Sequence, residues 1–165
     1  MLGQCSLLRK QRKAGAALEI SNRIIAYYPN FIPALVERMY ILMEMLSWDA
    51  VLEAAQRLGG SSPDNIDSLV VLAWYEICTE GASQSAAIYL RTLRKGIEKM
   101  EPENAEILFE LARPFVRLAD RNFQVLEECE TMIKSALSLK QDDSKLYLEM
   151  GYIYYLMSIK FQILS

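Results

Sequence analysis

The sequence of 165 residues contains no histidine. Histidine is the commonest general base in catalysis and the commonest metal ligand, so its absence weighs against most enzymes and most metal sites. No serine or cysteine has a histidine that would activate it. The segment LGGSSPDN (58–65) lacks the lysine and the preceding strand of a phosphate-binding loop. We therefore expect no catalytic residues, no cofactor and no bound metal.

Cysteine is scarce as well. Cys5, Cys78 and Cys129 lie far apart, and no two of them form a CxxC pair. Disulfide frameworks and zinc sites need an even or closely spaced set of cysteines. We interpret these three as reduced thiols in a cytosolic type of compartment. The start, MLGQCSLLRKQRK (1–13), is not a secretory signal, because its basic residues follow its short apolar run.

Positive charge is in deficit, with 18 lysines and arginines against 21 acids and a net charge of −3. Proteins that coat nucleic acid are usually basic, so nucleic acid is not an expected partner. The basic clusters RKQRK (9–13) and RTLRK (91–95) predict solvated or partner-facing helix surfaces. The acids Glu101, Glu103, Glu106 and Glu110 lie near one helix start, where acids in the first turn favour the helix dipole, and Glu106 and Glu110 are expected to face solvent. An acid–base or cation site is the weaker interpretation of these acids.

A long apolar run occurs only near the end of the sequence. Within 146–164 the only charged residues are Glu149 and Lys160. A membrane-spanning helix needs about 20 mostly apolar residues, and this run is too short and too interrupted. We expect no membrane span, and we predict instead a helix with one face in a core.

Three turn-like segments recur along the chain: YYPNF (27–31), SSPDN (61–65) and MEPEN (100–104). Their prolines are Pro29, Pro63 and Pro102, and the second interval is slightly longer than the first. Repeating the second interval leads to KQDDS (140–144), which lacks proline. A period of about 34 residues is typical of tetratricopeptide repeat (TPR) helix pairs. The recurring turns therefore predict stacked pairs of antiparallel helices.

The segments between the turns have apolar residues at helical spacing. First helices are predicted at 32–46, 66–78, 105–119 and 144–157, and second helices at 48–59, 84–99 and 122–139. One further helix is predicted at 5–28. Pro114 would kink or shorten the helix in which it lies. The predicted apolar faces are Leu35, Met39, Leu42 and Met43; Leu69, Leu72, Ala73 and Ile77; Leu108, Leu111, Ala112 and Phe115; and Tyr147, Met150, Gly151 and Tyr154.

The TPR motif places a bulky residue at the fourth position of each repeat and a small residue at the eighth. The fourth positions are Leu35, Leu69, Leu108 and Tyr147, and the eighth positions are Met39, Ala73, Ala112 and Gly151. At these two positions only Met39 departs from the motif, and at the eleventh position, which prefers an aromatic residue, Glu76 departs.

We therefore predict an all-α, TPR-like α-solenoid of about eight helices, as one segment over 1–165. Its parts are a half-repeat at 5–28, helix pairs at 32–59, 66–99 and 105–139, and a half-repeat at 144–160. A solenoid needs polar caps, and here both ends look open, so we expect the sequence to be part of a longer chain.

In TPR arrays the first helices line an inner groove, and this identifies a candidate binding surface. The candidate protein-binding residues are Val36, Tyr40, Val70, Trp74, Phe109, Arg113, Leu148 and Tyr152. The pattern indicates a groove for an apolar or helical segment, anchored by aromatic side chains. The alternative is that part of this stripe packs against neighbouring helices. Carboxylate binding is disfavoured, because Glu106 and Glu110 stand where chaperone-binding TPR domains need bases.

A closer resemblance lies in LEISNRIIAYYPNFIPALV (18–36), followed by WDAVLEAAQRL (48–58), MEPENAEILF (100–109) and LEMGYIYYL (148–156). These blocks resemble, in the same order, the tetratricopeptide repeat protein 21 family, which supplies the large TPR subunit of intraflagellar transport complex A. The resemblance implies a non-enzymatic scaffold in retrograde ciliary transport and in ciliary entry of membrane cargo. It implies other subunits of that complex as partners, and a location in the cytoplasm and at the cilium or its base. A free-standing TPR adaptor that binds a peptide in its groove is the second hypothesis.

Overall fold

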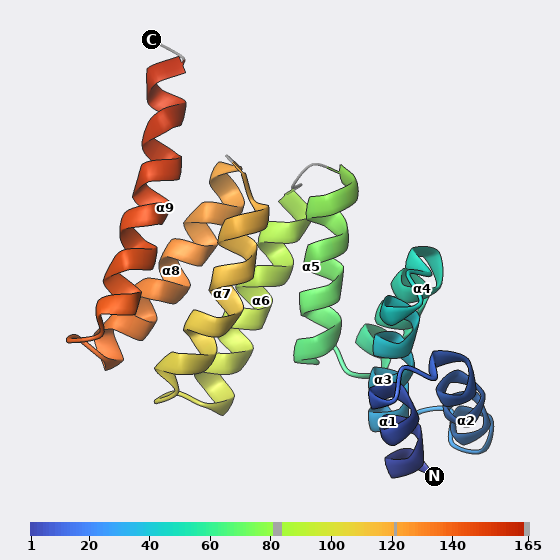
Figure 1. Ribbon diagram of the computed structural model, residues 1–165. Helices are drawn as coiled ribbons and strands as arrows, with labels where there is room; N and C mark the ends of the chain where they lie inside the picture. The colour runs from blue at the N-terminus through green and yellow to red at the C-terminus, as the bar shows by residue number, and fades with distance from the viewer. Residues whose placement is uncertain (81–83, 121, 164–165) are drawn as a thin grey trace. The chain divides into compact units, whose positions relative to one another are not determined.

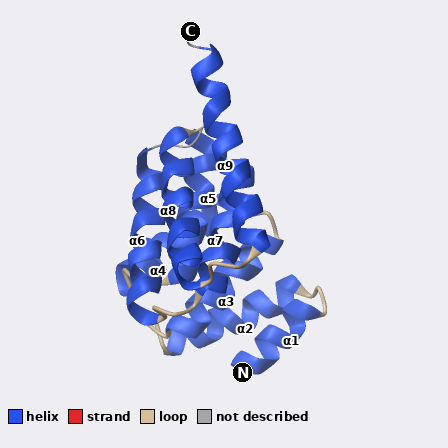
Figure 2. Ribbon diagram, turned by 90° about the vertical axis from the view of Figure 1, so that its left-hand side faces the viewer, coloured by secondary structure: helices blue, strands red, loops and turns tan. Residues whose placement is uncertain are grey.

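The computed structural model describes the backbone of residues 1–80, 84–120 and 122–163. Within these ranges it contains nine α-helices and no strand (Figures 1 and 2). The helices are α1 (Leu2–Lys10), α2 (Ala14–Tyr27), α3 (Ile32–Glu44), α4 (Trp48–Ser61), α5 (Ile66–Glu80), α6 (Gln84–Met100), α7 (Ala105–Leu118), α8 (Phe123–Leu139) and α9 (Ser144–Ile163). The all-α prediction is confirmed.

By its internal contacts the chain divides into two units, Met1–Leu72 and Ala73–Ser165. Unit 1 contains α1 to α4 and the first half of α5. Unit 2 contains the second half of α5 and α6 to α9. Each unit is described by itself below.

The single helix predicted at 5–28 is wrong, because the structure has two helices there. They are separated at Gln11–Lys13, where Arg12 adopts a left-handed backbone with φ 59°. The turn folds α1 back on α2, so that Cys5 and Ala17 become buried together with Ile41 of α3. The burial of this apolar cluster favours the hairpin over one continuous helix. The stretch is thus a helix pair, and the helix count rises from about eight to nine over the described ranges.

In unit 1, α2 packs on α3, and α3 packs on α4. Of the apolar face predicted for α3, Leu35, Met39 and Leu42 are buried, whereas Met43 is half-buried. The amphipathic helix α4 contributes Val51 and Leu58, which are almost fully inaccessible to solvent. Spacing of three and four residues therefore places the core face correctly in these two helices.

In unit 2, α7 packs on α8, and α8 also contacts α6 and α9. Buried side chains from successive helices meet in this interior, among them Leu90, Leu108, Phe115 and Met132. The helix α7 continues through Pro114 to Leu118, so an early end at the proline is wrong. Pro114 removes one backbone donor near the end of α7, where few further hydrogen bonds depend on it.

The recurring turns work as helix starts. In MEPEN the Asn104 side chain accepts a hydrogen bond from the Ile107 backbone N–H at 3.1 Å. Asn122 caps α8 in the same way, accepting from the Val125 N–H at 3.2 Å. Pro33 stands in the first turn of α3, where its missing donor is not needed. Capping satisfies backbone N–H groups that have no partner within the helix, and so fixes where each helix begins.

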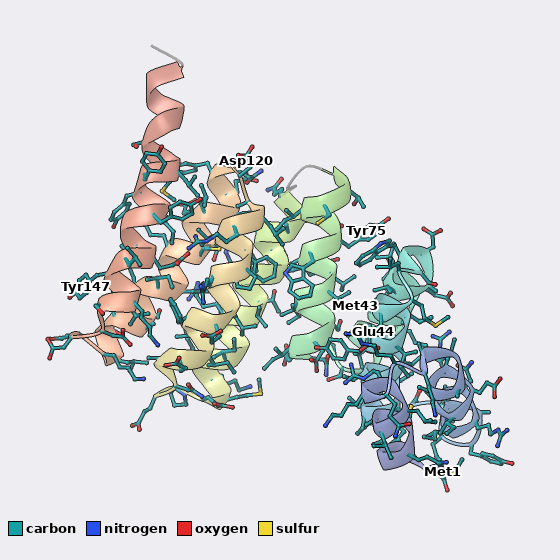
Figure 3. The ribbon with its side chains drawn as sticks, viewed as in Figure 1. Met1, Met43, Glu44, Tyr75, Asp120 and Tyr147 are labelled. Carbon is teal, nitrogen blue, oxygen red and sulfur yellow. The ribbon has the colours of Figure 1, made fainter. Side chains whose placement is uncertain are left out.

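Of the apolar face predicted for α9 only Met150 is confirmed, and the other three residues are wrong. The buried residues are Leu146, Glu149, Met150 and Ile153, whereas Tyr147, Gly151 and Tyr154 are exposed. Figure 3 shows Tyr147 projecting outward from α9. The physical reason is polar, because the helix is rotated so that the Glu149 carboxylate reaches an arginine of α7. Tyr154 instead forms a hydrogen bond with Glu130 on the surface of α8.

Three buried glutamates link helices that are two apart in the chain. Glu149 of α9 accepts hydrogen bonds from Nη1 and Nη2 of Arg117 in α7, at 2.7 and 2.9 Å. Glu128 of α8 accepts from Nε of Arg91 in α6 at 2.7 Å, and Arg94 lies 3.8 Å from its other oxygen. A buried carboxylate without such a partner is strongly unfavourable, so each glutamate requires its helix to sit beside the one that supplies the arginine.

The third glutamate follows the same pattern in unit 1. Glu37 of α3 lies 3.0 Å from Nε of Arg9 in α1, and Arg9 also lies 3.6 Å from Glu44. The basic clusters were predicted to be solvated or partner-facing surfaces. For Arg9 and Arg94 this is wrong, since their side chains are largely covered and face these carboxylates. Arg91 pairs with Glu128 but remains exposed, as predicted.

Removing the arginine from one of these pairs tests the assignment. We expect Arg117→Met to lower the free energy of unfolding by about 2 kcal/mol, because Glu149 stays buried without its partner. The loss stays well below that of a fully buried pair, because 46% of the Arg117 side chain is exposed. Urea denaturation followed by circular dichroism measures it. Lys140→Met, which breaks the exposed pair Lys140–Glu106, is the control and leaves the midpoint unchanged. Equal midpoints for both variants would contradict the role of Glu149.

Candidate functional site

The eight candidate groove residues lie in both units. Val36, Tyr40 and Val70 belong to unit 1, whereas Trp74, Phe109, Arg113, Leu148 and Tyr152 belong to unit 2. The two sets are therefore described separately, and a groove formed by all eight stays a prediction.

In unit 1, Tyr40 belongs to a polar network. Its hydroxyl donates a hydrogen bond to the Asp67 carboxylate, and the Arg9 guanidinium lies 5.4 Å from the centre of its ring. Burial, together with the hydrogen bond to Asp67, raises the pKa of Tyr40 well above its usual value. Val36 is half-buried and Val70 is buried. These contacts connect α1, α3 and α5 within the unit, which is a structural task.

In unit 2, two of the five candidates contribute to packing. Phe109 is only 7% exposed. Trp74 is half-buried, and its ring centre lies 6.0 Å from that of the buried Phe115. The indole N–H of Trp74 is buried and has no hydrogen-bond partner within the described part of the chain. The aromatic pair contributes apolar burial to the interior.

The other three candidates, Arg113, Leu148 and Tyr152, are exposed together on α7 and α9. Leu148 is 76% exposed and Tyr152 is 37% exposed. The Arg117 guanidinium lies 4.2 Å from the centre of the Tyr152 ring, which in turn stacks on Tyr155 at 6.4 Å. The helices α7 and α9 run in the same direction (Figure 1). Leu148 lies one turn before Tyr152 on α9, and Arg113 lies one turn before Arg117 on α7. Because Arg117 contacts Tyr152, Arg113 and Leu148 lie at the same height along the two helices.

We call Arg113, Arg117, Leu148, Tyr152 and Tyr155 the α7–α9 face. Two hydrogen bonds to the buried Glu149 hold the Arg117 guanidinium in place, and this guanidinium lies over the Tyr152 ring. It offers apolar and aromatic surface beside the exposed Arg113. Aromatic and arginine side chains on a rigid support are the usual anchors of protein interfaces. This arrangement suits recognition of another protein, and Tyr155 and Arg117 were not among the predicted residues.

No serine or cysteine nucleophile in the described residues has a histidine beside it, because the sequence contains none. No group of three acids or cysteines is placed to hold a metal ion there. Glu106 and Glu110 are exposed, as predicted, and Glu106 lies 3.5 Å from Lys140. The acids at the start of α7 thus favour the helix dipole and a surface ion pair.

The three cysteines are free and differ in environment. Cys78 is exposed, whereas Cys5 and Cys129 are buried. The Cys5 thiol donates a hydrogen bond to the Ala17 carbonyl at 3.2 Å. Burial, with a smaller contribution from Glu128, raises the pKa of the Cys129 thiol well above its usual value. Buried thiols that stay protonated are poor nucleophiles, so Cys5 and Cys129 act as core residues.

Thiol labelling should therefore distinguish the exposed Cys78 from the buried Cys5 and Cys129. At pH 8 we expect Cys78 to react with a maleimide reagent at least about 100-fold faster than Cys5 and Cys129, because only the Cys78 thiol is exposed to the reagent. Mass spectrometry of the digested protein measures each rate. Cys78→Ser removes the fast phase in the control. Three similar rates would contradict the burial of Cys5 and Cys129.

The raised pKa of Cys129 also predicts a pH dependence. In the unfolded chain the thiol ionises near 9.0, whereas burial keeps it protonated in the folded chain. The unfolded state therefore loses its proton first, and stability is lost as the pH rises above about 9. We expect the urea midpoint to fall less steeply between pH 8 and 10.5 in Cys129→Ala than in the wild type. Identical slopes would show that this thiol does not contribute.

Comparison with known families gives two matches to one family. Residues 1–52 match the family model described as the tetratricopeptide repeat protein 21 N-terminal ARM repeat. Residues 88–163 match the model of the tetratricopeptide repeat protein 21 second ARM domain. Together the two family models match most of the chain.

Curated relatives agree with this assignment. Human tetratricopeptide repeat protein 21B is 32% identical, over 92% of this chain and 12% of the relative. Its Xenopus laevis counterpart is 30% identical over 81% of this chain and 10% of the relative. Mouse tetratricopeptide repeat protein 21A is 28% identical over 94% of this chain and 12% of the relative. The chain thus spans only a small part of the length of the relatives it matches.

Solved structures show the same fold. The crystal structure of MamA has a TM-score of 0.64 at 14% identity, covering 92% of this chain and 82% of that one. A thermophilic TPR protein of Thermus thermophilus has a TM-score of 0.56 at 20% identity, and the match covers 95% of this chain and 84% of that one. The prediction of a TPR-like α-solenoid is confirmed. In the part of the chain that the structure describes, no helix combines the length and apolar content needed to span a bilayer.

Proposed function

Since the chain belongs to the tetratricopeptide repeat protein 21 family, we propose that it acts as a segment of the scaffold of intraflagellar transport complex A. Its fold is that of a TPR-type protein-interaction scaffold. The proposed role is non-enzymatic: it holds protein subunits together for retrograde ciliary transport and for ciliary entry of membrane cargo. Its proposed location is the cytoplasm and the cilium or its base.

The α7–α9 face is the observation that carries this proposal. Leu148 and Tyr155 expose most of their apolar surface, although Arg117, Tyr152 and Glu149 beneath them are held in a connected network. Such a surface loses little conformational entropy on binding, because its supporting side chains are already fixed. Burying its apolar atoms supplies affinity, and Arg113 supplies orientation by pairing with an acid of the partner.

A peptide-binding adaptor is the second candidate, favoured by the same juxtaposition of Leu148, Tyr152 and Arg113. It differs in its partner, which would be a short apolar or helical segment of a protein outside the transport complex. In that case the α7–α9 face would bind isolated peptides, whereas a scaffold contact would need the folded subunit. Recovery of partners from ciliated cells separates the two.

Affinity purification of the tagged chain from ciliated cells tests the proposal. We expect other subunits of intraflagellar transport complex A in the wild-type sample. Recovery should fall at least about tenfold in the double variant Leu148→Ala/Tyr152→Ala, because truncating two interface anchors costs more than about 1.4 kcal/mol. Ile88→Ala removes a similarly exposed apolar side chain from α6 and serves as the matched control.

Three outcomes would count against this account. Absence of all complex subunits from the wild-type sample would refute the scaffold role. Recovery of unrelated proteins, lost in the double variant, would support the adaptor instead. Equal loss in Ile88→Ala would show that the α7–α9 face is not the surface involved.

A further inference from the structure

A second surface, far along the chain from the α7–α9 face, lies wholly within unit 1. It is a hollow of about 440 Å³ lined by Met1, Leu2, Ile24, Tyr27, Tyr28 and Phe31. These residues come from the start of α1, the last turns of α2 and the turn before α3. Met1 lies at the start of α1 (Figure 3). We call this the tyrosine hollow, and none of its residues belongs to the predicted groove.

The tyrosine hollow combines aromatic lining with high exposure. Tyr27 is 77% exposed and Tyr28 is 67% exposed, and Phe31 and Met1 are also exposed. Isolated apolar side chains on a surface are ordinary, whereas several aromatic ones around a single concavity mark an interaction site. The volume falls in the range of concave binding sites, about 300–1,000 Å³.

The backbone that carries these side chains is ordered by hydrogen bonds. The Tyr28 N–H donates to the Ile24 carbonyl at 2.8 Å, and the Phe31 N–H donates to the Tyr28 carbonyl at 3.1 Å. From α4, Nη2 of Arg57 donates to the Pro29 carbonyl at 3.2 Å. The turn is therefore held from both sides, which fixes the backbone that carries Tyr28 and Phe31.

Two exposed arginines stand next to the hollow, each four residues after an exposed acid, Glu19 or Glu53, with which it forms no ion pair in the described part of the chain. No acid occurs in the sequence from Ile20 to Val36. Arg23 is exposed and lies one turn before Tyr27 on the same face of α2. Arg57 reaches the turn directly through its bond to Pro29. Two exposed guanidinium groups thus lie beside the residues that line the apolar hollow.

We propose that the tyrosine hollow docks a helical segment of another protein that inserts bulky apolar side chains and carries Asp or Glu beside them. The apolar side chains fill the concavity between Tyr27, Tyr28 and Phe31, and the acids pair with Arg23 and Arg57. A membrane surface would also meet aromatic and basic side chains. A concave site, however, receives a protruding side chain better than it rests on a flat interface, so the shape favours a protein segment.

Fluorescence anisotropy of the full chain with defined peptides tests this proposal. The probe is a labelled amphipathic helical peptide with Leu and Phe on one face and Glu on the other. The comparison peptide has Lys in place of every Glu. We expect the acidic peptide to bind at least about tenfold more tightly than the basic one, a difference of about 1.4 kcal/mol. In a protein labelled with ¹⁵N, the acidic peptide should shift the amide signals of residues 24–31.

Matched variants locate the binding. Tyr27→Ala/Phe31→Ala should weaken the acidic peptide at least about tenfold, and Arg23→Glu/Arg57→Glu should remove its preference over the basic peptide. Trp48→Ala truncates a similarly exposed aromatic residue outside the hollow and leaves binding unchanged. Circular dichroism checks that each variant is folded.

Several results would overturn the proposal. Equal binding of both peptides, or binding that survives Tyr27→Ala/Phe31→Ala, would do so. Binding to vesicles of phosphatidylcholine and phosphatidylserine, mixed four to one, without peptide binding, would assign the hollow to a membrane surface. Concentration-dependent dimerisation that Tyr27→Ala/Phe31→Ala abolishes would assign it to a second copy of this chain.

Discussion

The stacking of helices in each unit depends on carboxylates buried where the helices meet. Glu37, Glu128 and Glu149 are nearly inaccessible to solvent, and each is paired with an arginine from the helix two before its own. Apolar packing alone is tolerant of small rotations and shifts, because Leu and Met surfaces fit in several ways. A buried charge is not tolerant, since it demands its partner at hydrogen-bond distance.

This constraint explains why α9 has the orientation that it has. Apolar and aromatic residues occur on every side of α9, so helical spacing alone, which favoured Tyr147 and Tyr154, does not select the buried face. The structure instead buries Glu149 against Arg117 and leaves both tyrosines exposed. The same pair then fixes Arg117 under Tyr152 and builds the α7–α9 face. A core interaction in this way determines which side chains are offered to a partner.

Much of the fold could be predicted from local patterns. The turns that contain Pro29, Pro63 and Pro102 recur at similar intervals, and the buried residues of α3 and α7 follow helical spacing, so both were predictable. The turn at Arg12 was not, because Gln11–Lys13 contains neither glycine nor proline and only the contact of Cys5 with α2 reveals the fold-back. The partners of the glutamates were not predictable either, since Arg91 and Arg94 lie two helices before Glu128 along the chain.

The candidate surface divides in a similar way. Spacing placed Arg113, Leu148 and Tyr152 on exposed positions of α7 and α9, whereas Phe109 and Val70 are buried in the interior. The position of a residue in the repeat predicts which helix carries it. It predicts less well what fraction of the side chain is exposed. The tyrosine hollow has only a weak signal in the sequence. The YYPNF turn predicts the start of a repeat, but it does not predict a concave surface.

Hydrogen–deuterium exchange of Glu128→Gln tests most directly whether buried carboxylates hold the helices in place. Glu130→Gln is the matched control, because Glu130 lies on the same helix but pairs with Lys134 and Tyr154 instead of α6. The account predicts that exchange of backbone amides in α6 rises at least about tenfold in Glu128→Gln, as local opening becomes easier, and stays at the wild-type level in Glu130→Gln. Equal exchange of α6 in the two variants would contradict it.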